Sequence, residues 1–336
     1  IYTNHDYERY GLDRDAAVSS LAKESRVEFK TFKDQVVFEK DEVLSGAGTP
    51  YTVFTPYSRK WKALLAGIVL PNYPSSASRN YVSDTFNIPS LSDLGFQPSG
   101  LLFPQAIVAD ELIKSYAQDR DFPAKPGTSR LSVHLRFGTV SIRSLVRQAL
   151  GKSEVWLNEL IWRDFYFNIL HHFPHISEGH SFRKEYDRMK WRNNEEEFKA
   201  WCEGKTGYPI VDAGMRELNA TGFMHNRVRM IVASFLVKHL LIDWRWGEAY
   251  FAEKLLDFDF AANNGGWQWA AGSGCDAAPY FRVFNPSLQT QKFDQSLAYI
   301  KKWVPELQEL TYPAPIINHE FARGRVLAAY KEALGK

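Results

Sequence analysis

The distribution of strand and helix signals along the chain limits its fold more than any other feature. Apolar runs rich in β-branched and aromatic residues occur only near the start, at 27–32 and 36–38, and residues 1–3 are typical of the end of a strand. A helical pattern covers 12–22, and Thr55-Pro56 begins a second helix through Trp61 and Leu65, with proline in a permitted first-turn position. We therefore expect a small α/β unit over residues 1–70.

The rest of the chain shows two other patterns, a segment rich in proline and serine and then a long helical region. Residues 71–104 contain five prolines interleaved with seven serines and keep no period, which is typical of an interdomain linker that runs over the surface. The helices expected after it cover residues 106–118, 141–149, 155–173, 195–202, 212–220, 227–241, 247–256 and 293–304. The sequence thus predicts an α/β plus all-α protein, with a large all-helical domain over residues 105–336.

Composition excludes several classes of protein. The chain has 41 Lys and Arg against 39 Asp and Glu, so an anionic partner must meet a local patch and not a global field. Two cysteines cannot form a disulfide framework, which favours a reducing, cytoplasmic location. We expect no membrane span and no signal segment. Because the chain opens with Ile1 and not with Met, we expect the natural protein to begin earlier.

Common catalytic motifs are missing from the sequence. It contains no P-loop, no strand-linked dinucleotide fingerprint, no H-E-x-x-H zinc motif and no nucleophile elbow. His171, His172 and His175 are close in sequence, but Pro174 breaks the helix between them. A solvated surface trio is therefore favoured over a metal site, and we expect no metal.

The residues 257–269 give the strongest indication of a ligand site. Asp259, Asn263 and Trp267 follow one another at four-residue steps and share a helical face. Two glycines within this helix cost about 1 kcal/mol each relative to Ala, which a sequence tolerates where a backbone or a flat ligand must come close. The sixteen residues 260–275 carry no charge but include three amides and two indoles. We interpret them as a buried polar wall against a large ligand.

Two other helical faces carry polar groups. Trp156, Glu159 and Arg163 share one face, where either an ordinary surface ion pair or a ligand site would account for them. Asn226, Arg229 and Met230 share another; helix capping would explain Asn226 but would not explain an inward-facing Arg229.

A basic window covers residues 112–150. It holds seven Lys or Arg and two Asp, a local charge of +5, and either a solvated face or an anion site would account for it. The turn 127–132 within the window opens a helix with hydroxyl groups and backbone amides, which favours an anion site.

These segments together resemble the DNA photolyase/cryptochrome family. The motifs that carry the resemblance are Thr128-Ser129-Arg130-Leu131-Ser132, residues 156–166, residues 204–212, Met224-His225-Asn226-Arg227, residues 257–269 and residues 276–282. They cover residues 105–310 in order, and the chain is most similar to the class I members that repair cyclobutane pyrimidine dimers.

The resemblance implies that the helical domain holds FAD. Tyr116 and the turn of Thr128, Ser129, Arg130, Leu131 and Ser132 would hold the diphosphate and ribityl region. Trp156 and Arg163 would line the flavin cavity. Asn226, Arg229, Asp257 and Asp259 would contact the isoalloxazine and ribose, with Asn263 at flavin N5. Trp267, Trp244 and Trp191 match the family's chain of three tryptophans from flavin to surface.

The resemblance also implies light-driven repair of UV-damaged DNA by a monomer. A flipped lesion would be bound by Glu159 and Asn226, walled by Trp162 and Trp269, and packed by Met230. Arg120, Arg227 and Arg282 would engage the DNA backbone. Asn226 and Met230 stand where (6-4)-photoproduct enzymes have histidines, which favours dimer repair. The alternative is a cryptochrome-like blue-light signalling flavoprotein.

The start of the chain departs from the family pattern. The first strands of its Rossmann-like antenna domain are missing from the sequence, and Tyr10-Gly11 stand where folate-binding relatives have Asn-Glu. A second, antenna chromophore of the deazaflavin or the folate type therefore stays open: this departure puts folate in doubt and leaves the deazaflavin type, or no antenna chromophore, possible.

Overall fold

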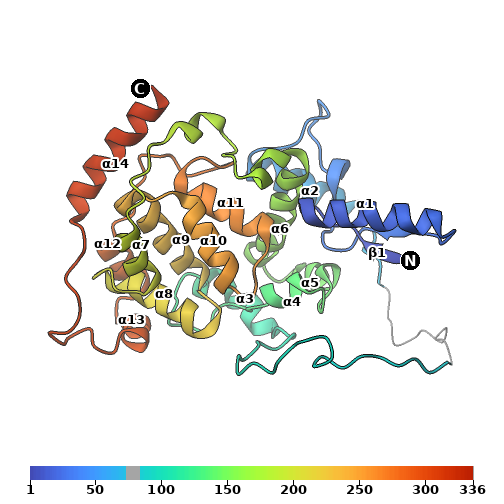
Figure 1. Ribbon diagram of the computed structural model, residues 1–336, viewed down its shortest axis with the longest axis horizontal. Helices are drawn as coiled ribbons and strands as arrows, with labels where there is room; N and C mark the ends of the chain where they lie inside the picture. The colour runs from blue at the N-terminus through green and yellow to red at the C-terminus, as the bar shows by residue number, and fades with distance from the viewer. Residues whose placement is uncertain (73–83, 336) are drawn as a thin grey trace.

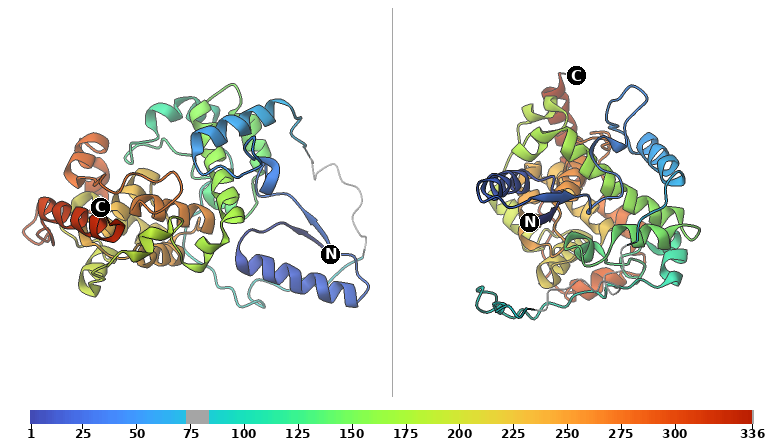
Figure 2. Two further views of the ribbon diagram at one scale, coloured as in Figure 1. Left: turned by 90° about the horizontal axis from the view of Figure 1, so that it is seen from above. Right: turned by 90° about the vertical axis from the view of Figure 1, so that its right-hand side faces the viewer.

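The computed structural model describes residues 1–72 and 84–335. The chain begins with a βαβ unit: β1 (Tyr2–Asn4), α1 (Arg9–Glu24) and β2 (Lys30–Phe32), in which the strands pair in parallel with Tyr2 opposite Lys30. A helical crossover is the usual way to join parallel neighbours, and α1 lies beside the two strands in Figure 2. The predicted helix and the strand at 27–32 are thus confirmed, with shifted bounds.

The strand predicted at 36–38 is wrong. Val36, Val37 and Phe38 are buried, but they pair with no strand. Instead the backbone N–H groups of Val37 and Phe38 donate to Oδ2 of Asp164, at 3.0 and 3.2 Å. The β-forming side chains reflect burial in the core and not a place in a sheet.

The predicted helix at Thr55-Pro56 is confirmed as α2 (Phe54–Ala66), which packs against α6 (Glu154–His172). Described residues 84–104 contain no helix or strand, as predicted for the linker, whereas residues 73–83 of that prediction lie outside the described ranges. Several large apolar side chains of this segment are exposed, including Ile88 and Leu102.

Helices make up nearly all of the remainder (Figure 1). Besides α6 they are α3 (Asp110–Asp119), α4 (Ser132–Arg136), α5 (Ile142–Ala149), α7 (Glu195–Cys202), α8 (Pro209–Thr221), α9 (Asn226–Ser234), α10 (Trp244–Lys254), α11 (Phe260–Ala271), α12 (Pro286–Phe293), α13 (Ala298–Trp303) and α14 (His319–Leu334). Within the described ranges no helix is long and apolar enough to cross a membrane.

Three helical predictions need correction. The helix expected at 227–241 is α9 followed by a π-helical segment, η5 (Phe235–Leu240), which ends at Leu241 with φ +53°. The helix expected at 293–304 is instead the end of α12 and the separate α13, because Leu297 adopts φ +58° between them. Helix α14 was absent from the expected helices; its apolar residues are too few to give a clear period.

Two apolar cores lie on either side of the site. One joins Tyr57 and Trp61 of α2 to Phe165 of α6, and the other joins α8, α9, η5, α10 and α11 around Trp201 and Trp267. Because α6 has buried residues on several faces, it has no single apolar stripe. Helices α6, α9, α10 and α11 therefore form a rigid frame, and the polar side chains they carry lie between the cores.

Candidate functional site

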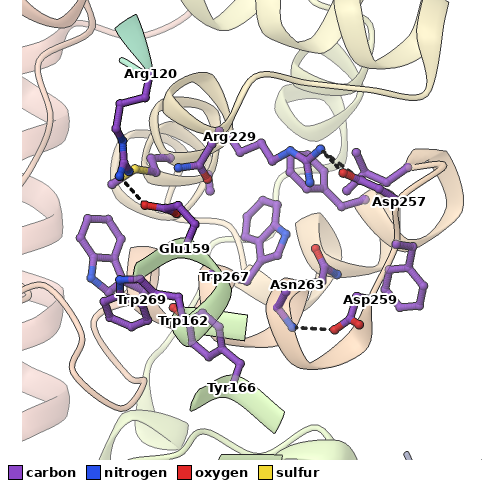
Figure 3. Close-up of a pocket in the computed structure, with 18 residues that line it drawn as sticks. Arg120, Glu159, Trp162, Tyr166, Arg229, Asp257, Asp259, Asn263, Trp267 and Trp269 are labelled. Atoms are coloured by element: carbon purple, nitrogen blue, oxygen red, sulfur yellow. Dashed lines mark hydrogen bonds and ion pairs between the residues drawn. The ribbon is translucent and has the colours of Figure 1, made fainter. Parts of the chain in front are cut away.

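A cavity of about 380 Å³ opens among helices α6, α9, α10 and α11 (Figure 3). Arg120, Glu159, Trp162 and Trp269 lie on one side of it, Arg229, Asp257 and Asp259 lie on the other, and Trp267 lies between. The lining also includes Tyr166, Asn226, Met230, Ala233, Phe251, Leu255, Phe258, Ala262, Asn263 and Gly266. Apolar rings with a few convergent polar groups are typical of a cofactor or ligand site.

Helix α11 forms one wall, as its four-residue spacing predicts. Asp259, Asn263 and Trp267 all line the cavity. Asp259 caps the helix by accepting from the N–H of Ala262 at 3.1 Å, and Asn263 Nδ2 donates to the carbonyl of Glu248 at 3.1 Å. The cap and the amide contact fix the direction of this wall.

The two glycines of α11 have different explanations. A Cβ on Gly265 would lie 2.2 Å from Cε1 of Tyr166, so this glycine accommodates a protein ring and not a ligand. A Cβ on Gly266 would meet nothing within 4 Å, and Gly266 lines the cavity. A third glycine, Gly247 of α10, is required by Trp267, because its Cβ would lie 2.1 Å from Cη2 of the indole. The close approach at Gly265 is thus to the side chain of Tyr166 and not to a backbone or a flat ligand as predicted, and the space beside Gly266 is open.

Arg229 faces inward, and the capping explanation for Asn226 is wrong. The cap of α9 is His225, whose side chain accepts from the N–H of Arg227, and Asn226 is the first helical residue. Arg229 Nη2 donates to both carboxylate oxygens of Asp257, at 3.1 and 2.9 Å, and its Nε donates to the carbonyl of Met224. One guanidinium nitrogen thus contacts both oxygens of the carboxylate, and this ion pair fixes Asp257 between two cavities.

A second cavity, of about 220 Å³, adjoins the first. It shares Asn226, Arg229 and Asp257 with the first cavity and is also lined by Tyr116, Thr128, Ser129, Arg130, Leu131, Ser132, Phe223 and Met224. Arg130 adopts φ +52° and places its guanidinium 4.4 Å from the Phe223 ring centroid. The structure thus brings the predicted hydroxyl-rich turn to the same site as α9 and α11.

Ion pairs hold the basic groups at the rim. Arg120 Nη1 donates to Oε1 of Glu159, and Arg227 Nη2 donates to Oδ1 of Asp121 at 2.6 Å. Burial raises the pKa of Glu159, and the neighbouring Arg120 opposes the shift. Glu159 is therefore a carboxyl poised to accept from, or donate to, a bound polar group.

Two rings at the rim form flat walls. Trp162 stacks on Phe54 with ring centroids 3.7 Å apart and planes 3° from parallel, while Trp269 lies 6.4 Å from Phe284. Arg282 lies on the loop after α11 and is exposed, with its guanidinium 5.6 Å from the Phe284 ring. These aromatic groups suit the binding of flat, weakly polar molecules.

Trp156 and Arg163 lie elsewhere than predicted. Trp156 is buried in the core with α2 and α5, and neither residue lines either cavity. Arg163 instead donates to the carbonyl of Gln35 and lies 4.7 Å from the Phe167 ring. Of the three residues expected on one α6 face, only Glu159 lines the cavity, since Trp156 is buried in the core and Arg163 is bound to the carbonyl of Gln35.

Most of the basic window also serves the fold. Arg136 pairs with Glu8 at 3.0 Å, Arg143 donates to the carbonyls of Asp34 and Val36, and Arg147 donates to that of Pro71. Only Arg120 and Arg130 of the seven basic residues line the two cavities. The interpretation of the window as one anion site is therefore wrong.

The predicted tryptophans share one core. Trp267 and Trp244 are buried in it, and Trp191 packs against it while remaining partly exposed. This order of burial is compatible with a path from the cavity to the surface.

Glu248 is a partly buried group that no sequence pattern indicated. Its Oε1 accepts from Asn264 Nδ2 at 2.9 Å, and burial raises its pKa to about 7. A single glutamate in the middle of a helix does not indicate a site from the sequence alone.

The three neighbouring histidines do not all meet. His171 and His172 lie near Asp41, with ligand atoms within 4.8 Å of one another, whereas His175 is not part of this group.

The donor set fits a large, polar, partly flat ligand. Oδ2 of Asp259 is buried at the cavity and has no partner among the described residues, so it can accept from a bound hydroxyl or ring N–H. The two adjoining cavities together offer aromatic walls at one end and hydroxyl groups with a guanidinium at the other. FAD has this division between its ring system and its diphosphate.

Comparisons with known proteins agree with this fit. Residues 156–311 match the model of the FAD binding domain of DNA photolyase, and residues 1–75 match that of DNA photolyase. The chain is 40% identical over 380 residues to the deoxyribodipyrimidine photo-lyase of Vibrio cholerae, covering 100% of this chain and 80% of that protein.

Solved structures are similar over the same span. A bacterial class III photolyase from Agrobacterium tumefaciens superposes with a TM-score of 0.87 at 36% identity, over 100% of this chain and 80% of the other. An archaeal photolyase from Sulfolobus tokodaii with two FAD molecules superposes with a TM-score of 0.80 at 36% identity, over 99% and 79%.

Proposed function

Because this chain belongs to the DNA photolyase family, we propose that its cavity joins FAD to a flipped-out pyrimidine dimer in DNA. The protein is a light-dependent DNA repair enzyme, a deoxyribodipyrimidine photo-lyase. The observation that carries the proposal is the pair of cavities that share Asn226, Arg229 and Asp257. The comparisons do not favour the alternative of a blue-light signalling flavoprotein.

The residues of the two cavities would hold FAD as follows. The turn Thr128–Ser132 and Tyr116 would bind its diphosphate region by hydroxyl groups and backbone amides, since both line the second cavity. Asp257 is fixed by Arg229, so its carboxylate stays oriented, and Asp259 offers the buried oxygen without a partner. Asn263 would face the reactive ring edge. Trp156 and Arg163 would not contact FAD; they would support the cavity walls through packing.

Glu159, Asn226 and Met230 would bind the flipped bases on the open side of the cavity. Reduced FAD, when bound, supplies an electron to the dimer on excitation by light. The protein's own task is to orient the lesion, and no group of the chain needs to turn over a proton. Glu159 has a pKa raised by burial, so it can hydrogen-bond a pyrimidine edge in the protonated or the ionised form. Trp162 and Trp269 would exclude water from both flat faces.

The rim would bind the DNA strand. We assign Arg120, Arg227 and Arg282 to the phosphates beside the lesion: Arg120 lines the cavity, Arg227 pairs with Asp121 next to Arg120, and Arg282 is exposed beside Phe284. Flipping costs less for a dimer than for an intact base, because a damaged base stacks and pairs poorly. A cavity with apolar walls then selects the flipped dimer over undamaged DNA.

Trp267, Trp244 and Trp191 would carry electrons from the surface to the cofactor when it is oxidised. Their common core and the exposure of Trp191 support this assignment. Indole rings can be oxidised and are held in close contact by packing. The path would serve activation of the cofactor and not the repair step.

The N-terminal residues 1–70 would be the last part of an antenna-type domain. At Gly11 a Cβ would lie 2.4 Å from the carboxylate of Asp6, so a larger residue at this position would displace Asp6. A folate antenna is disfavoured because Tyr10-Gly11 stand where folate-binding relatives have an Asn-Glu pair. We further propose that the protein acts as a monomer. Cys202 and Cys275 are both free, which supports a reducing compartment.

The experiment that tests the function is a repair assay. FAD-loaded protein is reduced, mixed with an oligonucleotide that contains a thymine dimer and illuminated with blue light. We expect intact thymines to appear in the light and none in a dark control. If no thymine appears while the flavin is fully reduced and the oligonucleotide is bound, the proposed function is wrong.

A further inference from the structure

Lys238 is a fully buried lysine that the proposed reaction does not use. It lies in the π-helical segment η5 and is 1% exposed. Burial lowers the pKa of Lys238 to about 7, and within the described ranges no carboxylate forms an ion pair with it. A π-helical turn is rare and is frequently found at functional sites, which is a reason to ask what this lysine does.

The ammonium group joins three elements. Nζ donates to the carbonyl of Ala271 at 3.1 Å and to that of Tyr280 at 3.3 Å, and it lies 3.9 Å from the Tyr330 ring centroid. Tyr330 donates its hydroxyl to the same carbonyl of Ala271 at 2.6 Å and stacks on Tyr280 with centroids 5.6 Å apart. Lys238 thus connects the end of α11, the loop that follows it and helix α14.

Each of the two carbonyls lies two residues away from a residue that we assign to lesion or DNA binding. Ala271 ends the helix that carries Trp269, two residues earlier. Tyr280 precedes Arg282 by two residues, and the N–H of Arg282 donates to the carbonyl of Pro279 at 2.9 Å, which makes this part of the loop a turn. The Arg282 guanidinium then lies over Phe284, which contacts Trp269. Fixing Tyr280 therefore fixes the direction of Arg282.

Packing alone does not explain a lysine at this position. An amine buried without a counter-ion loses its hydration, and an apolar side chain of similar length usually gives an equally or more stable fold. The lysine supplies several N–H donors, which an apolar side chain lacks, and they reach two carbonyls that belong to different parts of the chain.

We propose that Lys238 is a positioning residue for DNA recognition, which holds the loop 272–284 so that Arg282 and Trp269 meet the damaged strand in a fixed geometry. The inference rests on the proposed function, because the role that it assigns to the loop is to present Arg282 and Trp269 to DNA. Without the lysine the loop must be ordered on binding, and the cost of ordering it reduces affinity.

The test compares Lys238→Met with Lys331→Met, in which an exposed lysine of α14 is removed. Both are made in the FAD-loaded chain, and three quantities are measured: flavin content, Kd for an oligonucleotide with a thymine dimer, and the repair rate at saturating DNA. We expect Lys238→Met to keep its flavin and its melting temperature, to bind the DNA about ten-fold more weakly, and to repair bound DNA within two-fold of the unchanged rate. Lys331→Met should match the unchanged protein in all three.

An unchanged Kd for Lys238→Met overturns the proposal, and so does an equal loss of affinity and saturated repair rate. If Lys238→Met does not fold, the smaller Lys238→Gln replaces it, with the same criteria applied to Kd. A failure of the proposed function is distinguishable, because the unchanged protein would then not repair the dimer at all.

Discussion

Asp164 offers a quantitative test of how the first 70 residues are attached to the helical part. Its carboxyl is 1% exposed; Oδ2 accepts from the N–H of Val37 and Phe38 and from Nε1 of Trp61 at 2.9 Å. Oδ1 is buried without a partner among the described residues. Burial raises the pKa of Asp164 from 3.8 to about 6, although the three donors and Arg163 oppose the shift.

The sign of the effect follows from this shift. The native state binds the proton more tightly than the unfolded chain, so the carboxyl contributes stability that is fully present below pH 3.8 and lost as the pH rises through about 6. One pKa unit corresponds to about 1.4 kcal/mol, so the whole span is about 3 kcal/mol. Between pH 7.5 and pH 5 the contribution changes by about 1.4 kcal/mol.

The change to make is Asp164→Asn, which has nearly the same shape and does not titrate. The free energy of unfolding is measured by urea titration of both FAD-loaded proteins at pH 7.5 and at pH 5, with circular dichroism as the signal. The difference between the two proteins removes the effect of every other titrating group. We expect the unchanged protein to gain about 1.4 kcal/mol relative to Asp164→Asn at pH 5.

Two results would refute this reasoning about Asp164. A difference that does not depend on pH would mean that the pKa of Asp164 is ordinary in the native state. A relative loss of stability at pH 5 would mean that the three donors outweigh burial and hold the carboxylate in its charged form.

Three further predictions concern the site. Gly247→Ala should cost about 1–3 kcal/mol in thermal unfolding and slow photoreduction of oxidised FAD, because the added Cβ displaces Trp267; Gly324→Ala, which meets open space in α14, should not. Trp191→Phe should block photoreduction yet leave repair by pre-reduced enzyme unchanged, and losing both equally would indicate a role in folding. In Arg229→Lys a single ammonium replaces two separate donors, Nη2 on Asp257 and Nε on the Met224 carbonyl, so Asp257 loses its fixed orientation and flavin retention after dialysis should fall about ten-fold; full retention would contradict our assignment of Asp257.

The sequence predicted best what depends on helical period alone. Asp259, Asn263 and Trp267 share a face in any α-helix, so their common cavity was predictable before the surroundings were known. It predicted least well what depends on distant partners. Arg143 meets carbonyls more than 100 residues away, and nothing in the local charge pattern distinguishes such an arginine from one that binds phosphate.

The same limit explains the other errors. Val36, Val37 and Phe38 have strand-forming side chains, but the backbone N–H groups of Val37 and Phe38 donate to Asp164, which lies in a helix far along the chain. Lys238 stands in an apolar run that reads as ordinary α-helix, and only the π-helical turn of η5 brings it to its two carbonyls. Each of these contacts joins segments that are far apart in the sequence, and no local periodicity predicts that they meet.

The ion pairs at the rim have a consequence for how affinity responds to salt. Each arginine that takes a phosphate normally leads to the release of a condensed counterion, and log K falls with log salt in proportion to the number of phosphates neutralised. Arg227 and Arg120 already hold Asp121 and Glu159, so a phosphate must exchange with a carboxylate that stays on the protein. Part of each new arginine–phosphate attraction is offset by the arginine–carboxylate attraction that is lost. The affinity of this enzyme for DNA is thus expected to depend less steeply on ionic strength than its count of rim arginines suggests, and shape of the lesion, more than charge, sets its selectivity.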